Sequence, residues 1–148
     1  MKKLTRVLSV VMAIAMLFTM SMSASAATYT DVKAEDSYYE AVEALSALGV
    51  VKGYEAGDFQ PEGKITRAEA SKIIVAALNE TASAEAMKGA TKFSDVLAKH
   101  EWATGYINKG VSMGYIQGDN GKFDPDGNVT YAQVVKMLIC AMGYEDYA

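Results

Sequence analysis

The chain has 148 residues, of which 14 are Lys or Arg and 18 are Asp or Glu, so its net charge is −4 at neutral pH. This acidic balance argues against nucleic acid or an anionic membrane surface as a partner, because phosphate contacts need clustered Lys and Arg. The single cysteine excludes an internal disulfide, so the fold must depend on one modest core or on two half-size units.

Residues 1–26 have the layout of a secretory signal peptide. Lys2, Lys3 and Arg6 precede an apolar run of about sixteen residues, and small residues follow it. The run is short for a bilayer span, and the small residues suit a signal peptidase. We therefore expect cleavage after Ala26, with an uncleaved membrane anchor as the alternative. Cleavage leaves eleven basic and eighteen acidic residues, a net charge of about −7.

A short helix is predicted near the start of the mature chain, over about residues 38–48. Val42 and Leu45 lie on its apolar side. Gly49 follows, which suits the left-handed residue that closes many helices. The next stretch, 53–61, is rich in Gly and carries a Phe and then a Pro, so we expect a looped arm with at most a short extended piece.

A second helix is predicted to begin at Thr66. Apolar residues recur from Ala70 at spacings of three and four, the pattern of an amphipathic helix with one apolar stripe. Thr66 and Glu69, three residues later, form a capping box, in which side chains satisfy backbone N–H groups that the helix leaves free. Residues 81–90 are small and polar and are predicted to be a linker with room for one loose helical turn.

The rest of the chain repeats this pattern. Residues 57–78 align with 121–142 at an offset of 64, and eight of the 22 aligned positions are identical. The likeness extends upstream, because the Tyr-Thr-Asp-Val that opens the first copy matches the Phe-Ser-Asp-Val that opens the second. We therefore expect two repeats, at 28–80 and 91–145, that stack because one alone cannot bury its apolar face.

The second repeat is predicted to contain the same two helices. The first covers about residues 102–113 and ends at Gly114, and the second begins at Thr130 with Gln133 in the capping position. Cys140 lies inside the apolar run of this last helix. We interpret it as a core thiol, because no His or Asp near it in the sequence could activate it.

These motifs resemble the S-layer homology repeat. Its pattern is an aromatic-Asp-Val opening, a Trp at the first helix, a Gly-Tyr and Gly-x-Phe-x-Pro loop, and an Ile-Thr-Arg-Ala-Glu start to the last helix. The resemblance covers nearly the whole mature chain. The matching positions are Tyr29, Asp31, Val32, Gly53, Tyr54, Gly57, Phe59, Pro61 and residues 65–69 in the first repeat, and Phe93, Asp95, Val96, Trp102, Gly118, Gly121, Phe123 and Pro125 in the second.

The resemblance implies a mainly α fold of tandem helix-loop-helix repeats. In the family these repeats form part of a pseudo-threefold helical prism that a third repeat normally completes, so a third repeat or a second chain is an expected partner. Two positions depart from the pattern. Tyr131 stands where it has Arg, and Tyr38 or Ser37 stands where it has Trp.

The resemblance also implies a non-catalytic module, without a cofactor or metal, that holds an exported protein on the bacterial cell wall or surface layer. Its partner would be a secondary cell-wall polysaccharide, an anionic and often pyruvate-bearing glycan, bound in grooves near the Thr-Arg-Ala-Glu helix starts. Trp102 is expected to be largely buried or to line such a groove. The residues expected at the ligand are Gly53, Tyr54, Thr66, Arg67, Trp102, Gly118, Thr130 and Tyr131.

Arg67 also has a physical case of its own. It is the only arginine after the signal peptide and stands in the first turn of a capped helix, where free N–H groups and the helix dipole favour an anion. A planar guanidinium can hold a carboxylate with two hydrogen bonds. The alternative is an arginine that is exposed on the helix or paired with Glu69. Its replacement by Ala is expected to leave the fold nearly intact, because the cap is unchanged.

Three other functions compete with wall anchoring. A structural subunit of a surface array would use the repeats for protein association. A calcium loop is suggested by an EF-hand frame from Asp58 to Glu69, but its second copy has Lys122 and Gln133 at the first and last ligand positions. An enzyme is disfavoured, because the single histidine, His100, has no nucleophile, metal-ligand or phosphate-loop motif beside it and is interpreted as packing or surface.

Overall fold

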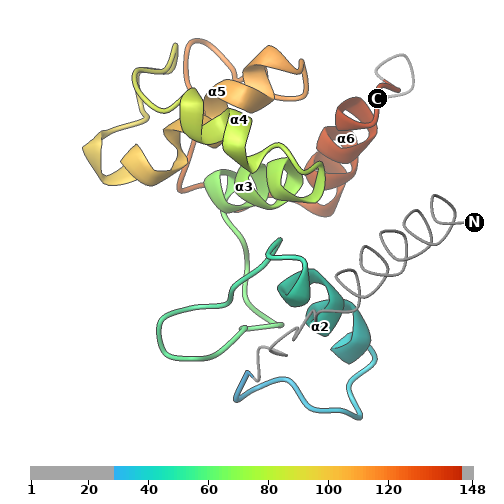
Figure 1. Ribbon diagram of the computed structural model, residues 1–148. Coiled ribbons are helices and arrows are strands. Elements are labelled where there is room, and N and C mark those ends of the chain that lie inside the picture. Colours follow the sequence, from blue (N-terminus) through green and yellow to red (C-terminus); the bar gives the residue numbers. More distant parts are fainter. Residues whose placement is uncertain (1–28, 145–148) are drawn as a thin grey trace, which may run out of the picture.

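The computed structural model describes residues 29–144, so the predicted signal peptide lies outside the described residues. The described part is helical, with two isolated β-bridges and no strand, which confirms a mainly α fold. Figure 1 shows its elements in chain order. They are α2 (Tyr39–Ala47), α3 (Arg67–Ala77), α4 (Thr81–Ala86), the 3-10 helix η1 (Ala98–Ala103), α5 (Thr104–Ser112) and α6 (Tyr131–Ala141).

The predicted helices are present, with one difference. α2 closes at Gly49, whose φ is +71°, and α5 closes at Gly114, whose φ is +83°, in the left-handed region that favours glycine. The single helix predicted over about 102–113 is divided instead, and Trp102 lies in η1, before α5 begins. None of the helices in the described residues is long and apolar enough to cross a membrane.

The opening motif of each repeat closes its looped arm. In the first repeat the Asp31 carboxylate accepts the backbone N–H groups of Phe59 and Gln60, each at 2.7 Å. The Phe59 N–H is the main cause that holds the pKa of Asp31 below its ordinary value. The ring of Tyr29 packs on Phe59 at a centroid distance of 5.3 Å. A Cβ on Gly53 would overlap the Tyr29 ring, so glycine is required there.

The second repeat reproduces this arrangement. Asp95 accepts the N–H groups of Phe123 at 2.9 Å and Asp124 at 2.8 Å. Burial raises the pKa of Asp95, but these hydrogen bonds outweigh it and the net shift is downward. Phe93 packs on Phe123 at 5.4 Å, and a Cβ on Gly118 would overlap the Phe93 ring. Both repeats therefore use the aromatic-Asp opening, the Gly and the Phe to build the same arm.

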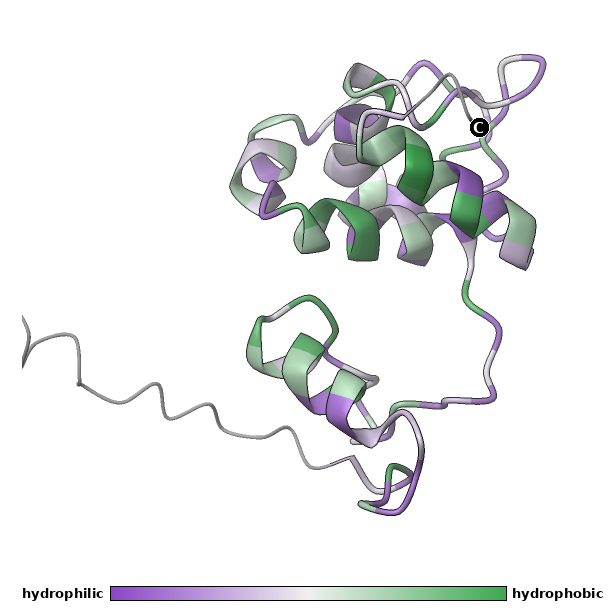
Figure 2. Ribbon diagram, turned by 90° about the vertical axis from the view of Figure 1, so that its right-hand side faces the viewer, coloured by the Kyte–Doolittle hydropathy of each residue, from purple (hydrophilic) through white to green (hydrophobic). Residues whose placement is uncertain are grey.

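The main core lies among α3, α4, α5 and α6, and α2 with its arm lies apart from it (Figures 1 and 2). A smaller apolar cluster of Tyr29, Val32 and Val42 holds α2 to the arm of its own repeat. α4 falls inside the predicted linker, and its Ala84 is fully buried against Gly105 of α5. This segment is thus one short helix packed into the main core.

The two repeats are joined by backbone hydrogen bonds at the start of α3. The N–H groups of Arg67 and Ala68 donate to the carbonyls of Gly127 and Pro125, at 2.9 and 3.2 Å. Val129 donates to the carbonyl of Ile65 at 3.1 Å, beside a β-bridge between Thr66 and Asn128. The arm of the second repeat therefore supplies acceptors for N–H groups that the helix itself leaves free.

Candidate functional site

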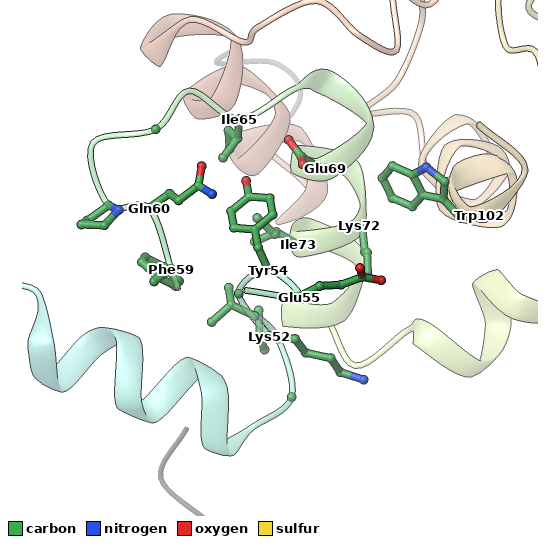
Figure 3. A pocket seen from close by; sticks show the side chains of 16 residues that line it. Lys52, Tyr54, Glu55, Phe59, Gln60, Ile65, Glu69, Lys72, Ile73 and Trp102 are labelled. Atoms are coloured by element: carbon green, nitrogen blue, oxygen red, sulfur yellow. The ribbon is translucent and has the colours of Figure 1, made fainter. Parts of the chain in front are cut away.

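A cavity of about 690 Å³ lies between the arm of the first repeat, α3 and η1. Tyr54 lines it from the arm, Lys72 from α3, and Trp102 from η1 beside α3 (Figure 3). It is large enough for a ligand of small-molecule size, and aromatic side chains with a few polar groups are typical of such sites. Its lining combines both repeats, because Trp102 comes from the second and the other lining residues from the first.

Two half-exposed aromatic side chains give the cavity its apolar surface. Tyr54 is placed by its backbone N–H, which donates to the carbonyl of Asp58 at 2.9 Å across the turn of the arm. Burial raises the pKa of its phenol, and the nearby charges of Glu69 and Asp58 add to the effect. Trp102 is held over α3, where the Lys72 ammonium lies 5.7 Å from the centre of its ring. This distance allows a cation–π contact.

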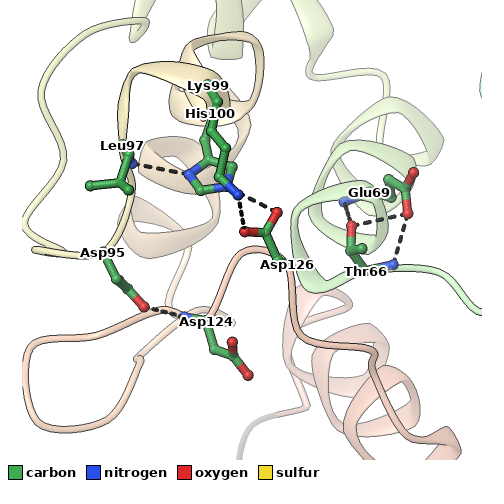
Figure 4. Close-up of polar contacts among 8 residues, drawn as sticks. All are labelled: Thr66, Glu69, Asp95, Leu97, Lys99, His100, Asp124 and Asp126. Atoms are coloured by element: carbon green, nitrogen blue, oxygen red, sulfur yellow. Dashed lines mark hydrogen bonds and ion pairs between the residues drawn. The ribbon is translucent and has the colours of Figure 1, made fainter.

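Charged side chains line the same cavity. Lys52 and Lys72 supply two cations, and Glu55 and Glu69 supply two carboxylates. The Glu69 carboxylate already takes part in the cap of α3, because one of its oxygens accepts the Thr66 N–H at 2.8 Å and the Thr66 hydroxyl at 2.9 Å (Figure 4). Of the two carboxylates only that of Glu55 is left for a ligand, so the two lysines outnumber it, and Lys72 stands next to the half-exposed Trp102.

A second cavity, of about 150 Å³, lies between α6, the arm of the second repeat and the start of α3. Its lining includes the polar side chains of Arg67, Gln117, Gln133 and Lys136. The wall also includes Tyr115, whose buried hydroxyl has no hydrogen-bond partner among the described residues. Burial strongly raises the pKa of this phenol, which keeps it neutral. The small cavity is therefore cationic and carries one unsatisfied polar group.

The two cavities are copies of one groove. Lys72, Glu69 and Ile73 of the large cavity correspond to Lys136, Gln133 and Met137 of the small one, at the offset of 64. Gly53 and Gly118 also correspond, at an offset of 65. Only the large cavity receives an aromatic ring from the following repeat, and only the small cavity receives an arginine from the preceding one. Each groove thus uses residues of two neighbouring repeats.

The structure divides the residues predicted at the ligand among four places. Gly53, Tyr54 and Trp102 line the large cavity, and Trp102 is half-exposed there, so it lines a groove as expected. Arg67 and Gly118 line the small cavity. Thr66 and Thr130 each accept the N–H three residues ahead in complete capping boxes, as predicted. Tyr131 is 87% exposed at the start of α6 and lines neither cavity.

Arg67 has a structural partner that the sequence did not reveal. Its Nε donates to the carbonyl of Phe123 at 2.8 Å, and its guanidinium carbon lies 5.1 Å from the centre of the Phe123 ring. It is therefore neither free on the helix nor paired with Glu69. The expectation of free N–H groups beside it was wrong, because the arm of the second repeat accepts those of Arg67 and Ala68. Its removal must therefore also weaken the junction of the repeats.

Two other predicted side chains are structural. Cys140 is buried, which confirms a core thiol. His100 is also buried, and its Nδ1 accepts the Leu97 N–H at 3.0 Å, so its Nε2 carries the proton toward Asp126, 3.0 Å away (Figure 4). Lys99 donates to the same carboxylate, and these two hydrogen bonds hold the pKa of Asp126 low. His100 thus packs and ties η1 to the arm of the second repeat.

The calcium alternative loses its last ligand, because Glu69 serves the cap of α3. Across residues 29–144 the structure holds no group of three or more His, Cys, Asp or Glu side chains that could bind a metal. Sequence reasoning also overlooked Lys72. The signal was present, because Lys72 and Lys136 are one of the identical pairs of the repeat on a helix whose other face is apolar.

Comparisons with known proteins agree with this repeated construction. The family model of the S-layer homology domain matches residues 28–71 and 92–135. A cell surface protein of Thermoanaerobacter kivui is 35% identical over 99% of the chain, and a surface layer protein of Brevibacillus choshinensis is 35% identical over 97%. A middle cell wall protein of Brevibacillus brevis is 34% identical over 81%. The chain spans only 20%, 13% and 11% of these three relatives.

Proposed function

Because the chain belongs to the S-layer homology domain family, we propose that it is a non-catalytic module that anchors an exported protein by binding a polymer of the cell wall. It is a secreted protein of the bacterial cell wall or surface layer. The partner that we propose is a secondary cell-wall polysaccharide with anionic substituents, such as pyruvate. The large cavity would hold it.

The single observation that carries this proposal is the pairing of Trp102 with Lys72 in the large cavity. The half-exposed ring of Trp102 and the nearby Tyr54 offer flat apolar surfaces for a sugar ring, and the Lys72 ammonium stands beside them for an acidic substituent. The mature chain has a net charge of about −7 and would repel an anionic polymer as a whole. Capture therefore depends on local cations such as Lys72.

The small cavity would be a weaker copy of this site. It holds the cations Arg67 and Lys136 but has no exposed aromatic ring in its lining. An acidic substituent could reach the guanidinium and the unsatisfied Tyr115 hydroxyl, but a sugar ring would have little apolar surface to cover. We therefore assign the larger share of binding to the cavity that contains Trp102.

Sedimentation with purified wall fragments tests the proposal. Trp102→Ala and Lys72→Ala should each lower affinity about tenfold, which corresponds to about 1.4 kcal/mol, the order expected for one lost ring contact or charged hydrogen bond. Lys33→Ala removes an exposed lysine outside both cavities and is the matched control. All variants are compared at equal thermal stability.

Two results would count against this function. Equal binding by wild type and Trp102→Ala would place the ligand elsewhere. Retained binding to fragments stripped of their polysaccharide but not of protein would instead favour the surface-array alternative, in which the repeats associate with other proteins. Fragments from which only the pyruvyl groups have been removed should bind less tightly, because they lack the charge that Lys72 would contact.

A further inference from the structure

Trp102 reaches the large cavity from η1, a short 3-10 helix. Its side chain is half-exposed, and the Lys72 ammonium lies 5.7 Å from the centre of its ring (Figure 3). The hydrogen bonds of a 3-10 helix have poorer geometry than those of an α-helix, so a short one has little stability of its own. The direction of the Trp102 ring therefore depends on what holds η1 to the rest of the protein.

His100 is a buried side chain of η1, with 4% of its surface exposed. Its Nδ1 accepts the Leu97 N–H at 3.0 Å and so caps η1. With Nδ1 as the acceptor, Nε2 of the neutral ring is the donor, and it lies 3.0 Å from Oδ1 of Asp126 on the arm of the second repeat (Figure 4). One ring thus fixes the start of η1 and links it to a segment 26 residues away.

Asp126 lies between the two residues that hold the start of α3. The carbonyls of its neighbours Pro125 and Gly127 accept the first two N–H groups of α3, at 3.2 and 2.9 Å. α3 carries Lys72 in its second turn. This three-residue segment therefore connects η1 to α3, and the His100 ring attaches η1 to it.

Lys99 also donates to Asp126, at 2.6 Å, but it is the weaker attachment. The side chains of Lys99 and Asp126 are both 63% exposed. Solvent and salt screen such an exposed ion pair, and ordering a long flexible side chain costs entropy. The buried His100 ring has no comparable freedom, so we assign the link between η1 and the arm to it.

The first repeat has the cap without the link. Its Asp36 stands where the second repeat has His100, at the offset of 64, and accepts the Lys33 N–H at 2.8 Å. The counterpart of Asp126 is Glu62, a second acid, and an ionised carboxylate has no proton to donate to another. The cap is therefore common to both repeats, while the link belongs to the second, whose aromatic residue lines the large cavity.

We propose that His100, through its hydrogen bond to Asp126, is a positioning residue that holds the Trp102 ring beside Lys72 in the large cavity. A 3-10 helix has about three residues per turn, so the side chains of His100 and Trp102, two residues apart, point in different directions. A link on the side of His100 resists rotation of η1 and so keeps the Trp102 ring beside α3. The effect on wall binding rests on the proposed function, because it requires that the ligand contacts Trp102.

The fluorescence of Trp102 reports its position directly, because it is the only tryptophan of the chain. His100→Gln keeps a donor near the position of Nε2, so acrylamide quenching of the ligand-free mature chain should stay close to wild type. His100→Asn keeps an acceptor near the position of Nδ1 but loses the link, so quenching should rise. Asp126→Ala, which removes the acceptor of the link, should raise quenching to the same extent.

Two controls accompany these variants. Lys99→Ala removes the exposed ion pair to the same carboxylate. Tyr106→Phe removes the hydrogen bond from the Tyr106 hydroxyl to Glu85, at 2.9 Å and outside both cavities, and so accounts for a general loss of stability. Both should leave quenching unchanged, with every variant measured at a temperature where it is fully folded.

Wall binding by His100→Asn and Asp126→Ala should weaken between about twofold and tenfold, the range expected when one more side chain must be ordered on binding. Unchanged quenching in Asp126→Ala, a rise in His100→Gln without one in His100→Asn, or an equal rise in Tyr106→Phe would each overturn the positioning role. Increased quenching with unchanged wall binding would support that role but contradict the proposed function, because the ligand would then not contact Trp102.

Discussion

Replacing Arg67 with Ala should destabilise the junction between the repeats. The change removes the hydrogen bond from Nε to the Phe123 carbonyl, worth about 1.5 kcal/mol or more for a charged donor, and the stacking on the Phe123 ring, worth about 0.5–1 kcal/mol near the surface. The higher helix propensity of Ala offsets only a few tenths of a kcal/mol of this destabilisation. The net loss should be about 2 kcal/mol.

Urea and thermal unfolding of the mature chain measure this loss. For a domain of this size about 2 kcal/mol corresponds to a lower Tm by roughly 8 °C. Arg67→Lys should recover less than half, because a lysine keeps the charge but not the planar group that reaches the carbonyl and the ring together. A double-mutant cycle with Phe123→Leu should show a coupling free energy of about 0.5–1 kcal/mol, because only the ring contact is lost with Phe123.

An Arg67→Ala protein whose free energy of unfolding matches wild type within about 0.5 kcal/mol would refute this reasoning, since that margin is usual for exposed sites. Wall binding must be measured on the same variant at a temperature where it is fully folded. A loss of binding without a loss of stability would mean that the guanidinium serves the ligand in the small cavity and not the junction.

Other measurements test further parts of the structure. Asp31 and Asp95 have lowered pKa values in the folded protein, so their contribution to stability is present above the unfolded pKa of about 4 and is lost as pH falls through the folded values. Asn at either position should lower Tm at neutral pH, and the difference from wild type should shrink below about pH 4. A difference that stays constant with pH would mean that the ionised carboxylates do not stabilise the arms. Gly118→Ala should destabilise by about 2 kcal/mol or more, because φ is +75° and the new Cβ would meet the Phe93 ring, and an unchanged Tm would contradict it. The secreted protein should begin at Ala27 by mass spectrometry, and material that retains the preceding residues would disprove cleavage.

The features that the sequence predicted well are those whose causes are local. A capping box depends on four consecutive residues, so Thr66 with Glu69 and Thr130 with Gln133 could be located without a structure, and both are formed. The helix-closing Gly49 and Gly114 depend on one backbone angle each. The repeat can be recognised from the sequence, because each copy must build the same arm from the same Asp, Gly and Phe.

The helix predicted over about 102–113 shows a feature that local sequence patterns cannot predict. Its apolar spacing does not reveal that His100 binds the Leu97 N–H and Asp126, and these contacts accompany a separate 3-10 helix. The predicted linker is a similar case. Small residues are compatible with a loop, yet the backbone carbonyl of Ala84 lies directly against Gly105, whose lack of a Cβ lets α4 approach α5 closely.

The sequence alone therefore determined the helical class, the two repeats, their caps and the family, because these depend on residues that are close together in the chain or recur at a fixed offset. Tertiary structure decided the site. Trp102 contacts Lys72 and shares a cavity with Tyr54 only after the second repeat folds onto α3, and Arg67 contacts Phe123 at a separation of 56 residues. Contacts between residues so far apart depend on how the repeats pack, and no local pattern encodes which ring or carbonyl a side chain will reach.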